Sequence, residues 1–136
     1  MYLCNKEDKK RLMHRHFLLI IALLCTIGLR AQRISYIETT RSWYYVYDDS
    51  GKRIHSVSTS QGQLVTYSST FYIIRQGNSF YIIYDAQGKR ITSLSVNVVG
   101  EIISANENTF TSRNNSWIYI WSKEGKRISS RSASLK

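Results

Sequence analysis

Proline is absent from the 136 residues, and cysteine and histidine are scarce. The two cysteines, Cys4 and Cys25, lie within the first 31 residues, so the rest of the chain has no disulfide, thiolate metal site or cysteine nucleophile. His55 is the single histidine after residue 31, which excludes a zinc site or catalytic dyad built from several histidine or cysteine side chains of one chain. We therefore predict no catalytic residue, no metal site and no cofactor, and we interpret His55 as a surface residue.

The first 31 residues have the pattern of an export signal. A basic start leads into an uncharged apolar run over residues 17–29, and Ala31 precedes Gln32. The run is short for a membrane-spanning helix, which needs about 20 apolar residues. A basic segment, a short apolar run and a small residue before a polar start are typical of a signal peptide.

This segment resembles the export signals of Gram-negative secreted proteins that end in Ala-Gln. The resemblance implies a signal-peptide helix over residues 1–31, cleaved after Ala31, and a single domain over residues 32–136 with no membrane span. We expect that domain to be exported and to be periplasmic, on the cell surface or secreted. An uncleaved anchor is the alternative, and it would also leave the domain outside the membrane.

A 37-residue repeat organises the chain after the leader. Three segments begin with serine and an aromatic residue and end in Gly-Lys-Arg-Ile, and a spacing of 37 separates each from the next. They span residues 42–54, 79–91 and 116–128. Thirteen matched positions at one spacing, three times over, indicate that each segment is part of the same structural unit.

Each unit is expected to consist of short strands. Residues 43–48 are aromatic and β-branched, which strands favour, and a tip closed by Gly51 with positive φ is typical of a hairpin. Four strands per unit, with the first strand of the first unit missing, give about eleven. The equivalent strands that begin at Trp43, Phe80 and Trp117 are apolar on both faces, which predicts burial on both faces. Arg131 marks the last strand as a sheet edge with a protective charge.

The repeat resembles the blade of a β-propeller. Four antiparallel strands in about 40 residues is the size of a blade, and residues 77–91 are similar to a blade's inner hairpin. The resemblance implies an all-β fold, an antiparallel meander of about three 37-residue, four-stranded blade-like repeats. A propeller typically has four to eight blades. Two chains joined in one ring, an open meander and a small closed trefoil or prism therefore remain as alternatives.

The acidic residues do not form a pattern typical of a catalytic carboxylate pair or a calcium-binding loop. Asp48 and Asp85 are repeat-equivalent, but the third unit has Ser122 there. Glycoside hydrolysis needs two carboxylates across a cleft, and a calcium loop needs a run of spaced oxygen ligands that the segment after Asp48 lacks. We interpret both aspartates as turn formers, because their carboxylates accept backbone N–H bonds at hairpin tips.

Basic pairs follow the tip glycine in every unit. Residues 1–31 hold six of the 19 basic and two of the nine acidic residues, which leaves 13 and seven and a net charge of +6. Stacked units would align the pairs into a row able to bind acidic glycans, lipopolysaccharide phosphates or another polyanion. The alternative is that these charges keep the turns soluble. The candidate polyanion-binding residues are Lys52, Arg53, Lys89, Arg90, Lys126 and Arg127.

Two functions are consistent with these features. The first is an exported, non-enzymatic β-repeat protein that binds a protein partner or a surface polyanion or glycan. The alternative is a structural assembly module, a partial β-propeller that self-association completes. The aromatic residues are interpreted as core and cross-strand packing rather than as a sugar site.

Overall fold

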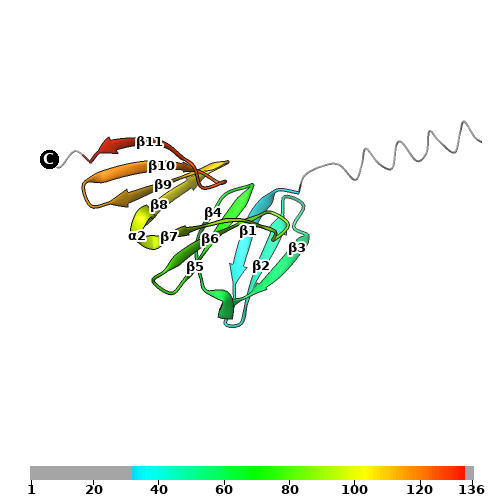
Figure 1. Cartoon of the computed structure of the whole chain (residues 1–136). Coiled ribbons are helices and arrows are strands. Elements are labelled where there is room, and N and C mark those ends of the chain that lie inside the picture. The colour runs from blue at the N-terminus through cyan, green and yellow to red at the C-terminus, as the bar shows by residue number, and fades with distance from the viewer. Residues whose placement is uncertain (1–31, 134–136) are drawn as a thin grey trace, which may run out of the picture. The chain divides into compact units, whose positions relative to one another are not determined.

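The computed structural model describes residues 32–133, which form eleven strands in three antiparallel sheets (Figure 1). The first sheet contains β1 (Ile34–Thr39), β2 (Trp43–Asp48) and β3 (Arg53–Ser58). The second contains β4 (Gln63–Tyr67), β5 (Phe71–Gln76), β6 (Phe80–Asp85) and β7 (Arg90–Ser95). The third contains β8 (Glu101–Asn106), β9 (Thr109–Asn114), β10 (Trp117–Ser122) and β11 (Arg127–Ser132).

The predicted all-β meander of three repeats is confirmed. Within each sheet the strands are hydrogen-bonded in chain order, and the first sheet has three strands where the others have four. The strand missing from the first unit is therefore missing from the first sheet. The predicted signal peptide and its helix over residues 1–31 lie outside the described residues.

Three equivalent hairpin tips join the last two strands of each sheet. In the first tip the Gly51 N–H donates to the Asp48 carbonyl (3.0 Å) and the Asp48 N–H donates to the Lys52 carbonyl (2.9 Å). Gly51 has a φ of 81°, a conformation that favours glycine, and a bulge follows in β3. The same two backbone bonds close the tips after β6 and β10, so the predicted turn chemistry holds in all three repeats.

Short helical turns lead into the second and third sheets. A 3₁₀ turn, η1 (Thr59–Gln61), precedes β4, and a single α-helical turn, α2 (Val96–Val99), precedes β8. Each ends at a glycine whose carbonyl accepts a bond from a buried tyrosine. Tyr44 donates to Gly62 (2.8 Å) and Tyr81 donates to Gly100 (2.7 Å). Strands β2 and β6 are thereby hydrogen-bonded to the connection that leads into the next sheet.

Two apolar cores hold the three sheets together, and the second sheet contributes to both. Between the first and second sheets, Val46 packs with Tyr72 and Ile74. Between the second and third sheets, Ile73 and Ile83 pack with other buried residues of that junction. Full burial of one such side chain contributes about 1.5–3 kcal/mol. The second sheet therefore lies between the other two, as Figure 1 also shows.

Burial on both faces is confirmed for β6 and wrong for β2 and β10. Tyr81, Ile82 and Ile83 are all buried because neighbouring sheets cover both faces of β6. The strands β2 and β10 belong to the outer sheets, and each has one covered face. The aromatic residue that begins each of the three strands is exposed, because it lies at the strand end opposite a small serine of the returning strand.

Candidate binding surfaces

The six predicted polyanion-binding residues are exposed and lie at equivalent places on the three hairpin tips. The backbone N–H of each lysine is held by the residue that begins its turn. Lys52 and Lys89 donate to Asp48 and Asp85 Oδ1 (2.9 Å each), and Lys126 donates to Ser122 Oγ (3.2 Å). These hydrogen bonds thus fix the backbone position of each of the three lysines at its hairpin tip.

The arginines of the pairs lie back on their own sheets. The Arg53 guanidinium stacks 4.1 Å from the centre of the Tyr45 ring, and Arg127 lies 5.1 Å from that of Tyr119. Arg90 Nη2 instead donates to Ser93 Oγ (2.8 Å). None of the six side chains forms an ion pair with another described residue. Their charge is therefore available to a partner.

The second and third tips each lie against the returning strand of the sheet before them. Gly88, in the second tip, lies against the ring of His55, two residues after Arg53. Gly125, in the third tip, lies against Thr92, two residues after Arg90. This placement is consistent with the predicted alignment of the basic pairs along one side of the stacked sheets.

The aspartates at the tips act as turn formers. Asp48 Oδ1 accepts bonds from the Ser50 hydroxyl (2.6 Å) and from the Ser50 and Lys52 N–H groups. These bonds, the Ser50 hydroxyl first, hold the pKa of Asp48 below its usual value. Asp85 accepts the N–H groups of Gln87 and Lys89 in the same way. Among residues 32–133, no three His, Cys, Asp or Glu side chains converge to hold a metal ion.

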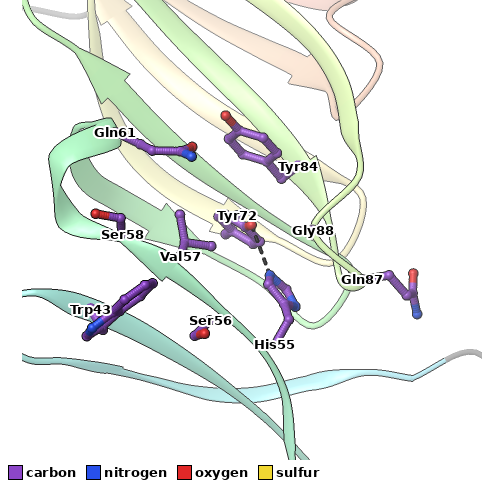
Figure 2. A pocket seen from close by; sticks show the side chains of 10 residues that line it. All are labelled: Trp43, His55, Ser56, Val57, Ser58, Gln61, Tyr72, Tyr84, Gln87 and Gly88. Carbon is purple, nitrogen blue, oxygen red and sulfur yellow. Dashed lines mark hydrogen bonds between the residues drawn. The ribbon is translucent and has the colours of Figure 1, made fainter.

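An open pocket of about 480 Å³ lies at the junction of the first and second sheets (Figure 2). Its walls come from β2, β3, η1, β5, β6 and the second hairpin tip. The lining residues are Trp43, His55, Ser56, Val57, Ser58, Gln61, Tyr72, Tyr84, Gln87 and Gly88. Figure 2 shows the His55 ring pointing at the Tyr72 hydroxyl in the middle of this junction.

His55, which we interpreted as a surface residue, is half-buried beside this pocket. Its Nε2 lies 3.0 Å from the Tyr72 hydroxyl, and its Nδ1 is buried without a hydrogen-bond partner. Burial holds the pKa of His55 below its ordinary value, while the Asp85 carboxylate acts weakly in the opposite direction. Burial also raises the pKa of Tyr72. Burial at the junction therefore disfavours the charged form of His55.

Comparison of the repeats could have revealed this polar junction. Thr92 is the repeat counterpart of His55. The stacked pair of Tyr72 and Tyr84, with ring centres 5.1 Å apart, corresponds to the stacked pair of Phe110 and Trp121 in the next junction. Each junction thus has its own polar pair, His55 with Tyr72 in the first and Trp121 with the buried Ser112 in the second. The difference is present in the sequence, but only the sheet stacking shows that it is buried.

Two outer sheet faces have no covering sheet in the described part of the chain. The first sheet exposes Tyr36 and Trp43, beside the half-buried Tyr45 and Tyr47. We call this the leading face. The third sheet exposes apolar side chains on the side away from the second sheet. We call this the trailing face, and its apolar members are Ile103, Ile118, Ile120 and Ile128.

The fold and these surfaces define an all-β repeat protein of stacked meanders, whose exposed features are cationic tips and open sheet faces. Residues 44–85 match the family model described as surface layer protein A domain. The match starts in β2 and ends with β6, so it covers about one repeat period. It favours an exported or cell-surface location. A comparison with curated proteins finds no match.

One further finding bears on the membrane. No helix within residues 32–133 combines the length and hydropathy needed to cross a bilayer.

Proposed function

We propose that the protein is an exported, non-enzymatic module that acts by binding a macromolecule outside the cell. The observation that carries this proposal is the set of three equivalent hairpin tips, each with an exposed Lys-Arg pair that forms no ion pair with a described acid. The match to a surface layer domain supports an exterior location. Phosphate and carboxylate groups of a surface polyanion, such as an acidic glycan or lipopolysaccharide, fit these cations.

Removing one basic pair tests this proposal. We expect the double variant Lys89→Ser/Arg90→Ser to elute from immobilised heparin at lower salt than the unaltered protein. Exposed ion pairs contribute about 0.2–1 kcal/mol each, so two of them correspond to about 2- to 30-fold in affinity. The matched control is Arg41→Ser/Arg113→Ser, which removes two exposed arginines that also form no ion pair and lie away from the tips. Equal elution of the two double variants would show that the tips have no special role.

A structural assembly module is the second candidate, and the two uncovered sheet faces favour it. Exposed apolar side chains on the leading and trailing faces mark surfaces that a protein partner can cover. The first sheet is also one strand short of its counterparts. A second copy that docks on these faces would extend or complete the stack of sheets.

Solution mass as a function of concentration tests assembly. We expect the exported form of the chain to show a weight-average mass that rises with protein concentration in sedimentation equilibrium, because apolar association follows mass action. The mass should persist at high salt, since apolar contacts are not screened. A constant monomer mass up to high micromolar concentration would remove assembly as a function and leave polyanion binding unaffected.

A further inference from the structure

The two uncovered outer faces carry residues whose repeat counterparts in the other sheets are buried in a junction between sheets. Tyr36 is 54% exposed, whereas its counterparts Tyr72 and Phe110 are 2% and 1% exposed in the two junctions. Ile120, on the opposite end, is 37% exposed, whereas its counterparts Ile83 and Val46 are both 0% exposed. The repeat therefore places a junction-forming residue on each end of the stack.

The two ends are the two halves of one kind of junction. Inside the chain, the face of the first sheet that carries Val46 packs on the face of the second sheet that carries Tyr72. The second sheet then presents Ile83 to the face of the third that carries Phe110. The trailing face, with Ile120, is the counterpart of the faces that carry Val46 and Ile83. The leading face, with Tyr36, is the counterpart of the faces that carry Tyr72 and Phe110.

The hairpin tips also indicate that the first sheet lacks a neighbour that the other two sheets have. The tip glycines of the second and third sheets, Gly88 and Gly125, lie against the returning strand of the sheet before them. Gly51, the tip glycine of the first sheet, has no atom of residues 32–133 within 4 Å of where a Cβ would lie. The space that a preceding sheet fills at the later tips is empty at the first tip.

The charges at the two ends are complementary. Asp49, exposed beside Gly51, has as counterparts Ala86, which is buried in the first junction, and the half-buried Lys123 of the third tip. Arg131, exposed on β11, has Val57 and Leu94 as counterparts, and both of these pack into junctions. A third sheet placed against the first sheet of another copy brings Arg131 toward Asp49. Asp49 and Arg131, one at each end of the stack, thus carry opposite signs.

From these observations we propose that the trailing face of one copy docks on the leading face of a second copy, head to tail, and repeats the junction already formed twice within the chain. This inference deepens the assembly function proposed above and rests on it. The interface is heterologous, because two different surfaces meet. Two copies give six sheets if the stack closes, and further copies add three sheets each if it stays open.

Mixing two variants tests this geometry. Tyr36→Asp disables the leading face and Ile120→Asp disables the trailing face, and we expect each variant alone to be monomeric with at least a tenfold weaker association. An equimolar mixture should form a one-to-one complex, because the trailing face of Tyr36→Asp and the leading face of Ile120→Asp are both intact. The measurement is sedimentation velocity on the exported form of the full chain.

Controls separate the possible failures. Val98→Asp changes an equally exposed apolar residue on α2, outside both faces, and should associate like the unaltered protein. Tyr36→Ser and Ile120→Ser form a second pair in case an aspartate prevents folding. The head-to-tail geometry is wrong if the unaltered protein associates but the mixture stays monomeric. It is also wrong if either variant still self-associates. In both cases the proposed assembly function is not contradicted. If the unaltered protein is monomeric, both the geometry and the assembly function are wrong.

Discussion

Substituting alanine for Gly100 is expected to unfold the protein or to lower its melting temperature by roughly 10–30 °C. A Cβ on this residue would lie 2.3 Å from the Arg113 carbonyl oxygen and 2.8 Å from the Asn114 Cβ, and neither can move without shifting β9. The backbone (φ 82°, ψ −144°) is also a conformation that favours glycine. Backbone strain of about 1–3 kcal/mol and overpacking of about 1–3 kcal/mol together take a large part of the stability of a small domain.

The matched control for this prediction is Gly51→Ala. Gly51 has nearly the same φ, 81°, but nothing within 4 Å of a Cβ, so only the backbone strain of about 1–2 kcal/mol remains. Thermal unfolding followed by far-ultraviolet circular dichroism compares the two variants. Equal losses in melting temperature would mean that the close approach of the Gly100 turn to β9 is unimportant.

The protein is expected to lose stability as the pH falls below about 6.5, because His55 must then be protonated inside the first junction. Burial lowers the pKa of His55 in the folded protein from its ordinary value of 6.5. The unfolded chain therefore takes up the proton first, and stability that is complete above pH 6.5 decreases as the pH falls. Protonation places a positive charge on a ring whose Nδ1 is buried without a hydrogen-bond partner, and burial disfavours that charge.

His55→Thr is the matched variant for this prediction, since threonine stands at the equivalent position in the second sheet. Urea unfolding at pH 7.5 and pH 5 gives the free energy of unfolding of both proteins. We expect the unaltered protein to lose more stability than the variant between these two pH values. Only the pH dependence is compared, so a uniform effect of the substitution does not matter. Parallel losses would mean that another group causes the acid sensitivity.

Much of the fold could be predicted from the sequence because its signals are local and recur. The strand over residues 43–48, the tip closed by Gly51 and the missing first strand all followed from one 37-residue pattern, and the structure confirms them. The turn role of Asp48 followed from its place before the tip. Each of these features depends on a few consecutive residues, whose preferences are the same in any surroundings.

The candidate surfaces were predicted only in part. The basic pairs were placed correctly on exposed tips, but nothing local indicates that Arg53 lies over Tyr45. The environment of His55 was missed because it depends on Tyr72 and Gly88, which belong to another sheet. The exposed Tyr36 could not be distinguished from the buried Tyr72, since both are tyrosines opposite an aromatic residue of the next strand.

By itself, the sequence determined the period, the hairpins and the identity of the strands, since these depend on contacts between residues close together along the chain. Tertiary structure alone decided which of three nearly identical sheets has both faces covered. Stacking gives the second sheet two neighbours and leaves each outer sheet one, so equivalent side chains become core in one sheet and open surface in another. Position in the stack, rather than residue type, separates the core from the surfaces available for binding.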